Sequence, residues 1–197
     1  MGKRVTSKNA FAEFNFAEEC GRERLCQWLF DVVNGKKPKP LIIVGPVASG
    51  KTELLRLIDG ILGGTWLYDI CRKNQTLEII EHLHLDRCVV IDDVTYPRYR
   101  DGSIHDILLR VAEDGEIPCR KKFSTTEAVV MMANAAFAVV FRYNDEKRVL
   151  ADTYLLHNCK IIQLAPLRPR SKLNGVDEYR TWLAYETADP YRSDDER

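Results

Sequence analysis

The sequence predicts an α/β fold in which a mostly parallel central sheet is flanked by helices, with a short N-terminal helix before it and an extension after it. Two features predict this class. Short, wholly apolar runs, such as residues 41–44 and 88–91, are typical of strands that are covered on both faces. Segments with helical spacing alternate with these runs, and that alternation favours parallel strands joined by crossover helices.

The expected elements follow one another at short spacing. Apolar side chains at helical spacing predict a helix over residues 16–34, and Pro38 and Pro40 prevent its continuation because proline lacks a backbone donor. A strand over 41–44 and a helix over 52–62 come next, on either side of a glycine-rich turn. The remaining expected elements are strands over 65–70, 88–91, 128–133 and 160–164, helices over 76–83, 103–113 and 177–187, and a hairpin over 117–124.

Length and composition fit one compact unit. The chain has 197 residues, of which 45% are hydrophobic and 29% charged, and these values exclude wholesale disorder. We expect residues 1–40 to form an N-terminal helical segment and linker, residues 41–165 the core, and residues 166–197 a linker, a short helix and an acidic tail. The last helix is expected to pack either on the core or on a neighbouring subunit.

Charge and hydropathy restrict the partners and the location. The 29 basic residues balance 29 acidic ones, so any contact with nucleic acid must be local rather than driven by a global positive field. No apolar run approaches the roughly 20 residues that a membrane-spanning helix needs, so we expect an intracellular protein without a membrane segment. The 6 cysteines include no CxxC pair, which favours buried free thiols.

The glycine-rich turn matches the phosphate-binding pattern GxxxxGK[ST] at every position, between an apolar strand and a helix. Glycines let backbone N–H groups face phosphate oxygens, and the helix adds its positive dipole end. Lys51 would reach the β and γ phosphates of ATP, and Thr52 would bind Mg²⁺. The alternative is a glycine turn that happens to contain a lysine. The matching residues are Gly45, Pro46, Val47, Ala48, Ser49, Gly50, Lys51 and Thr52.

Polar residues follow two later apolar runs. Asp92 ends the run 88–91, where its carboxylate could hold the Mg²⁺, and Asp93 could orient and deprotonate the attacking water. Asn134 follows the run 128–133, and at the same edge of the sheet its amide could contact the γ-phosphate or the water. The alternative for all three is that Asp and Asn end strands as turn formers.

The order GPVASGKT, VVIDD, DGEIPCRKKF and VVMMAN resembles motifs A, B, B′ and C of superfamily 3 helicases, the AAA+ motors of small DNA viruses, plasmids and phages, over residues 41 to 165. The resemblance implies a P-loop NTPase core of the AAA+ type that assembles into a ring. It also implies a viral or mobile-element origin and a location in the cytoplasm or the host nucleus. It further implies ATP and Mg²⁺ as cofactors and single-stranded nucleic acid as partner, with DNA favoured over RNA, and an origin-binding or replication protein as a further partner.

Motif B′ of that family includes a lysine on a hairpin that grips the strand in the central channel of the ring. By position, Lys121 or Lys122 would take that role, with Arg120 and Phe123 beside them. Cations next to an aromatic side chain suit phosphates and a stacked base, although the same composition is common in solvated hairpins.

The family also places an arginine just before the next strand, where it reaches the ATP site of a neighbouring subunit. This sequence has Asn158 at that position, which departs from the pattern. Arg148 and Arg142 lie upstream and could substitute, and Arg148 is favoured because it precedes an expected helix.

Together these features predict an ATP-hydrolysing motor, a hexameric ring that translocates on or unwinds nucleic acid during replication. The alternative is a P-loop ATPase that remodels proteins or membranes in a replication complex, similar to ATPases of RNA viruses, without helicase activity. A small-molecule kinase is a third class, disfavoured because paired acids suit water as the acceptor.

Overall fold

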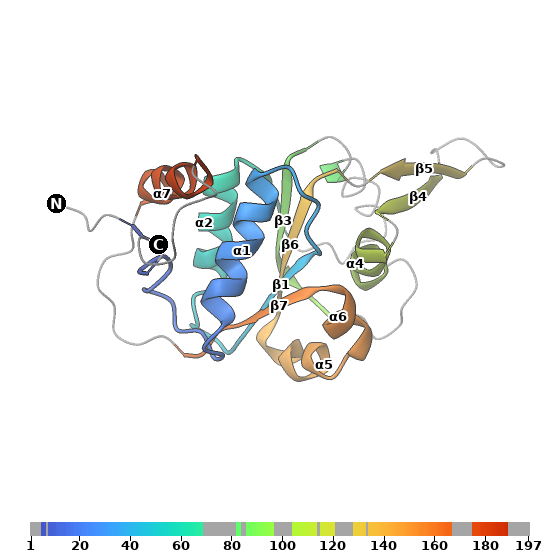
Figure 1. The fold of residues 1–197 in the computed structure, drawn as a ribbon. Coiled ribbons are helices and arrows are strands. Elements are labelled where there is room, and N and C mark those ends of the chain that lie inside the picture. The colour runs from blue at the N-terminus through green and yellow to red at the C-terminus, as the bar shows by residue number, and fades with distance from the viewer. Residues whose placement is uncertain are drawn as a thin grey trace.

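The computed structural model describes residues 5–6, 8–68, 82–83, 86–96, 104–113, 115–120, 128–132, 134–166 and 175–188. Its centre is a five-stranded sheet in the order β2-β3-β6-β1-β7, in which every pair of neighbours is parallel (Figure 1). This sheet confirms the predicted α/β class. Its strands are β1 (Leu41–Val44), β2 (Thr65–Tyr68), β3 (Cys88–Val94), β6 (Ala136–Phe141) and β7 (Lys160–Gln163).

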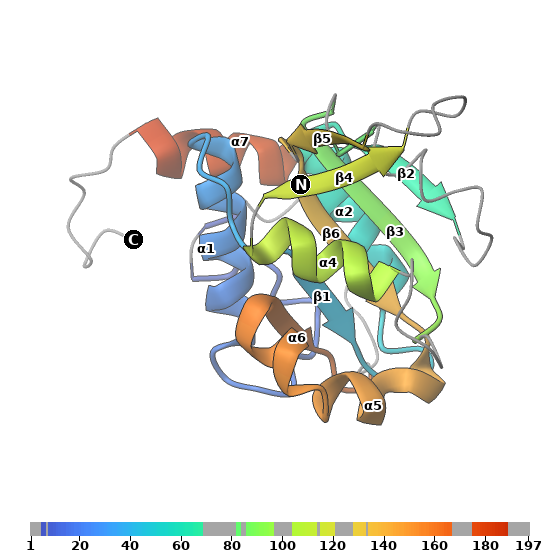
Figure 2. The same ribbon diagram turned by 90° about the vertical axis from the view of Figure 1, so that its right-hand side faces the viewer.

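Helices cover both faces of the sheet (Figures 1 and 2). Successive side chains of β1 point to opposite faces, so Leu41 and Ile43 enter one buried cluster whereas Ile42 and Val44 enter the other. The first cluster is completed by α1 (Gly21–Val33), α2 (Lys51–Leu62) and α7 (Val176–Ala188). The second face carries α4 (Ile104–Glu113), the short turn η1 (Tyr143–Asp145), α5 (Glu146–Leu150) and α6 (Thr153–Asn158).

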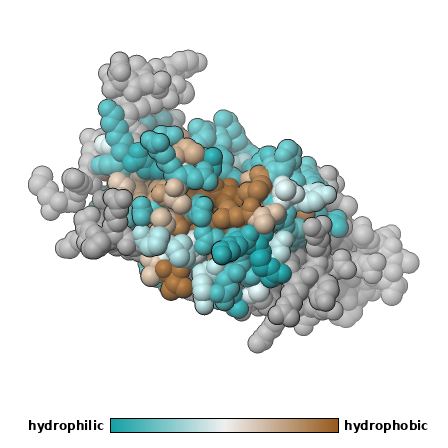
Figure 3. Space-filling view, turned by 90° about the horizontal axis from the view of Figure 1, so that it is seen from below, coloured by the Kyte–Doolittle hydropathy of each residue, from teal (hydrophilic) through white to brown (hydrophobic). Residues whose placement is uncertain are grey.

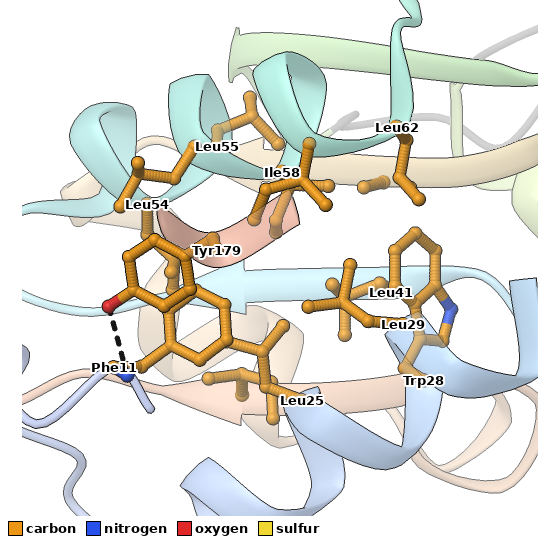
Figure 4. Close-up of a cluster of buried hydrophobic side chains, with 14 of the residues drawn as sticks. Phe11, Leu25, Trp28, Leu29, Leu41, Leu54, Leu55, Ile58, Leu62 and Tyr179 are labelled. Atoms are coloured by element: carbon orange, nitrogen blue, oxygen red, sulfur yellow. Dashed lines mark hydrogen bonds between the residues drawn. The ribbon is translucent and has the colours of Figure 1, made fainter. Parts of the chain in front are cut away.

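The ends of the described chain meet in the larger cluster (Figure 4). Phe11 stacks on Tyr179 of α7 with ring centroids 4.5 Å apart, and the Phe11 N–H donates to the Tyr179 hydroxyl at 3.0 Å. Trp182, also on α7, lies nearly perpendicular to the Phe11 ring, with the ring centroids 6.2 Å apart. The last helix therefore packs on the core, which decides between the two expected positions, and residues from all three expected segments share one cluster.

One predicted strand lies elsewhere. The run 128–133, expected to be the third strand of the main sheet, forms β5 (Ala128–Met132), which pairs antiparallel with β4 (Glu116–Arg120). The expected hairpin over 117–124 is thus confirmed in its first strand only, because the second strand lies at 128–132 and residues 121–124 are outside the described residues. The hairpin projects away from the main sheet (Figure 1). The third strand is β6, because residues 135–141 are all buried and apolar and so suit a position covered on both faces.

The cysteines that the structure describes are free thiols. Cys88 and Cys159 are buried, as expected, whereas Cys20 and Cys26 are only partly buried. Burial raises the pKa of the Cys26, Cys88 and Cys159 thiols to about 12. The predicted helix over 76–83 lies outside the described residues except for its last two. Within the described ranges, no helix has the length and apolarity required to cross a bilayer.

Replacing Tyr179 by Phe should lower the free energy of unfolding by about 1–3 kcal/mol, because the buried Phe11 N–H would lose its acceptor. The same hydroxyl donates to Glu13 Oε1 at 2.5 Å, and that bond is lost as well. Urea denaturation measures the difference. The control is Tyr185→Phe on the same helix, where the side chain is 47% exposed and a change below about 0.5 kcal/mol is expected. Equal effects of the two substitutions would contradict this role of Tyr179.

Candidate functional site

The carboxyl ends of three adjacent strands bring polar residues to one edge of the sheet. Gly45 follows β1, Asp92 and Asp93 lie near the end of β3, and Arg142 follows β6. In parallel α/β sheets this edge is where ligands collect. This edge lies at the bottom of the molecule in Figure 1, near α5 and α6. Seen from below, the surface has hydrophobic residues near its centre, surrounded by hydrophilic ones (Figure 3).

The loop after β1 has a backbone that depends on glycine. Gly45 has a φ of 153°, and a Cβ there would lie 2.6 Å from the backbone oxygen of Leu164 at the end of β7. Gly50 has a φ of 86° at the N-cap of α2, and Ala48 is also left-handed at 59°. These turns bring the loop back over the end of the sheet, so that the 12-residue helix α2 begins at Lys51 with its positive end toward the loop.

Lys51 bridges its own loop. Its Nζ donates to the carbonyl oxygens of Gly45 at 2.7 Å and Pro46 at 2.8 Å. Partial burial lowers the pKa of the Lys51 ammonium, and the negative charges of Glu146, Asp92 and Asp93 act in the opposite direction. An ammonium held near three carboxylates and two carbonyls can exchange those carbonyls for phosphate oxygens without losing hydrogen bonds.

The loop also contains a buried hydroxyl. Ser49 is fully buried, and within the described part of the chain its Oγ has no hydrogen-bond partner. A Cβ on Gly45 would lie 2.9 Å from this oxygen, so glycine at that position makes the room for it. Thr52 follows Lys51 in the first turn of α2. These donors fit a phosphate group, and the Thr52 hydroxyl and the Asp92 carboxylate are oxygen ligands of the kind Mg²⁺ takes.

The two aspartates of β3 have different environments. Asp92 is 7% exposed and its Oδ1 accepts a hydrogen bond from the Asp93 N–H at 2.9 Å. The register of β3 against β6 shifts between Ile91 and Val94, and within this bulge Asp93 has a left-handed φ of 58°. The bulge separates the two carboxylates: Asp92 stays buried while the Asp93 side chain is 60% exposed.

Arg142 holds Asp93 in this conformation. Its Nη2 lies 3.0 Å from Asp93 Oδ2, and its Nε donates to the Asp93 carbonyl at 3.2 Å. One guanidinium therefore fixes both the side chain and the backbone of a residue in a sparsely populated conformation. Sequence reasoning considered Arg142 only as a residue acting on a neighbouring subunit. The buried apolar run 135–141 directly before it is the pattern that could have placed it here.

Asn134 does not reach this edge, and the prediction of its position was wrong. It precedes β6, whose first residue Ala136 pairs with Cys88 at the start of β3, so Asn134 lies at the amino edge of the sheet. There its N–H donates to the Leu83 carbonyl at 2.8 Å. The strand before Asn134 is β5 of the hairpin and not a strand of the main sheet. The third strand of the main sheet is β6, and the residue after its carboxyl end is Arg142.

Arg148 on α5 contacts residues of its own chain. Its guanidinium lies 3.4 Å from Asp145 Oδ1 and 5.0 Å from the centroid of the Tyr96 ring, and its side chain is 48% exposed. Asn158 donates to Glu113 Oε1 at 3.3 Å. A role of Arg148 in a neighbouring subunit stays a prediction. Of the predicted nucleic-acid residues, Arg120 ends β4, whereas Lys121, Lys122 and Phe123 lie outside the described residues.

A buried network connects the segment after Asp93 to the helices of the second face. Asp152 Oδ2 accepts from the Tyr96 hydroxyl at 2.6 Å and lies 2.7 Å from His105 Nε2. Its Oδ1 caps α6 by accepting from the backbone of Tyr154 and Leu155. Burial works against the charged Asp152 carboxyl, but the hydrogen bonds outweigh it and lower its pKa. Sequence reasoning missed this network because its members are far apart in the chain.

Comparison with known proteins supports the assignment of the fold. No family model matches the chain, and no curated protein matches it. Among solved structures, the apo C-terminal region of NrS-1 superposes with a TM-score of 0.56 at 14% identity, covering 94% of this chain and 45% of that one. Two variants of RuvB from Thermotoga maritima each give a TM-score of 0.51, at 15% and 16% identity. The chain has the P-loop NTPase fold of the AAA+ type.

The P-loop NTPase fold accounts for the position of the site at the carboxyl edge. The chain spans less than half of the length of these structures: it covers 46% and 48% of the two RuvB chains. At these identities the similarity concerns the fold, and the chemistry of the site rests on its own residues.

Replacing Gly45 by Ala in this P-loop should lower the free energy of unfolding by about 2–3 kcal/mol, because the new Cβ would collide with the Leu164 carbonyl. Gly35→Ala is the control. Gly35 has a left-handed φ of 71° but nothing within 4 Å of the added carbon, so only the backbone strain of about 1 kcal/mol is expected. Urea denaturation of both variants compares the two costs. If Gly35→Ala were as destabilising as Gly45→Ala, the close approach to Leu164 would not constrain the loop.

Proposed function

We propose that the chain is an ATP-hydrolysing, oligomeric motor of the superfamily 3 helicase type that translocates on or unwinds single-stranded nucleic acid during viral or mobile-element replication. The observation that carries this proposal is the convergence of Lys51, Asp92 and Asp93 at one edge of the sheet, with Arg142 fixed on Asp93. A phosphate-binding loop beside one buried and one exposed carboxylate suits hydrolysis better than binding alone.

Lys51, Thr52 and Asp92 have different roles in the proposed phosphoryl transfer. Lys51 moves its ammonium from the carbonyls of Gly45 and Pro46 to the β and γ phosphates of ATP, and its partial burial strengthens that attraction. Thr52 and the buried Asp92 would hold Mg²⁺, which would neutralise charge that develops on the phosphates. The N–H groups of residues 47–52 and the start of α2 bind the remaining phosphate oxygens.

Asp93 orients the attacking water. Its exposed carboxylate is held at 3.0 Å by Arg142, so the carboxylate is positioned before ATP arrives. Because β6 lies between β3 and β1 in the sheet, Asp93 and Arg142 lie beside the phosphate loop at the end of β1. Arg142 is therefore a positioning residue for Asp93. At the carboxyl end of the third strand, where Asn134 was expected, the polar residue is Arg142.

The remaining parts of the motor concern assembly. In a hexameric ring, half-exposed Arg148 would reach the ATP site of the neighbouring subunit, replacing the arginine that this chain lacks at Asn158. The projecting β4–β5 hairpin would carry Arg120, Lys121, Lys122 and Phe123 into the channel of the ring (Figure 1). Phosphate contacts there do not depend on base sequence.

Changing Lys51 to Ala should abolish ATP turnover and weaken ATP binding, because the loop would lose its only lysine at the phosphates. Steady-state phosphate release and an ATP titration measure both effects. The control on the same helix is Arg56→Ala, whose side chain is 55% exposed and paired with Glu53. Normal turnover by Lys51→Ala would overturn the proposed site.

The same assay separates the motor from the remodelling ATPase. Addition of single-stranded DNA should accelerate ATP turnover by the unmodified protein. Turnover that does not respond to DNA or RNA would support the remodelling function instead.

Changing Arg142 to Ala should lower ATP turnover at least about tenfold while ATP affinity changes little, because Asp93 would lose its fixed position. The free energy of unfolding should change by less than about 1 kcal/mol, since both side chains of the pair are partly exposed. The matched control is Arg110→Ala, which removes an ion pair of similar length, 3.0 Å to Asp106, on α4. Equal turnover by the two variants would contradict the positioning role of Arg142.

A further inference from the structure

A cleft of about 480 Å³ opens at the amino edge of the sheet, opposite the phosphate loop. Its walls are the loop that joins α1 to β1, the last turn of α4, Arg87 before β3, and the residues before and at the start of β6. The volume lies within the range of roughly 300–1,000 Å³ that is usual for ligand sites. Nothing in the proposed ATPase chemistry uses this cleft.

The charges on the cleft are mostly positive. Lys36, Lys37, Lys39 and Arg87 line it together with one carboxylate, Glu113. Lys36 pairs with Asp31 at 3.2 Å, and Glu113 accepts a hydrogen bond from the side-chain amide of Asn158. Among the described residues, no carboxylate lies within 4.0 Å of the charged groups of the other three cations. Their charge is therefore available to an anionic ligand.

The loop that carries the lysines is fixed by its surroundings. The Trp28 indole N–H donates to the Lys39 carbonyl at 3.0 Å, and Lys39 Nζ donates to the His157 carbonyl at 2.7 Å. Pro40, at the end of the loop, accepts from the Lys160 N–H at 2.8 Å. These contacts hold the backbone of the loop in place, so less entropy is lost when a ligand binds.

The cleft adjoins the base of the β4–β5 hairpin. Gly115, directly before β4, and Asn134, shortly after β5, both line it. The five residues of β4 extend about 17 Å from this base to Arg120, at the usual rise of roughly 3.3 Å per residue. Lys37 Nζ lies 3.5 Å from Asn134 Oδ1, so a cation reaches the hairpin base itself.

We propose that this cleft binds backbone phosphates of the same single strand that the hairpin contacts, through Lys37, Lys39 and Arg87. The inference rests on the proposed nucleic-acid function and adds a second contact point to it. Separate cations along an open cleft match a ligand with repeated phosphates better than a single phosphate ion. The site is on the opposite edge from Lys51, so it is not a second part of the ATP site.

The test is fluorescence anisotropy with a labelled oligothymidylate, measured at several salt concentrations. The variant is Lys37→Ala with Arg87→Ala, two exposed side chains whose removal leaves the contacts of Lys39 in place. The control, Lys8→Ala with Arg180→Ala, removes the same charge from exposed positions away from the cleft. Thermal unfolding and ATP turnover without DNA are expected to be unchanged in both.

The double variant in the cleft should bind the oligonucleotide at least about tenfold more weakly. The slope of log K against log salt is negative, and it should become less steep by about 1.4, because each lost phosphate contact on a single strand reduces its magnitude by about 0.7. The control should keep the affinity and the slope of the unmodified protein.

Three other results would overturn the inference in distinguishable ways. Unmodified protein that hydrolyses ATP but binds no oligonucleotide would remove the nucleic-acid part of the proposed function. Normal oligonucleotide binding by the cleft variant would remove the cleft alone. Binding of a labelled polyglutamate peptide that depends on Lys37 and Arg87, with oligonucleotide binding unaffected, would assign the cleft to an acidic polypeptide instead.

Discussion

The parallel pairing of β3, β6 and β1 is the constraint on which the rest of the structure depends. Parallel neighbours end at a common edge, so the loop after β1, the aspartates of β3 and the arginine after β6 come together although they are far apart in the sequence. The same pairing sends the strand beginnings to the opposite edge, with the hairpin base and the basic cleft. The proposed nucleotide site and the proposed strand contacts are thereby separated by the length of the sheet.

Contacts link the nucleotide edge to the helices of the second face. Arg142 forms an ion pair with Asp93. Three residues after Asp93, Tyr96 donates its N–H to Asp145 at 2.8 Å and its hydroxyl to Asp152. Asp145 in turn pairs with Arg148. Tyr96 thus ties the segment after Asp93 to the starts of α5 and α6 through hydrogen bonds.

The sequence predicted those features whose chemistry is local. The phosphate loop, the apolar strand before it and the aspartates after β3 are each contained in a few consecutive residues, and the structure places them at one edge. Two consecutive apolar runs, 128–133 and 135–141, could not be distinguished as strands by pattern alone, and the first was assigned to the wrong sheet. The pairing of Arg142 with Asp93 spans 49 positions and depends on that assignment, so it was missed.

The proposed function requires that this edge binds ATP with Mg²⁺ through Lys51, Thr52 and Asp92. A structure determined with Mg²⁺ and a non-hydrolysable ATP analogue tests it most directly. We expect Lys51 Nζ to leave the carbonyls of Gly45 and Pro46 for the β and γ phosphates, with Thr52 and Asp92 holding Mg²⁺. An analogue bound elsewhere, with Lys51 still on those two carbonyls, would contradict it.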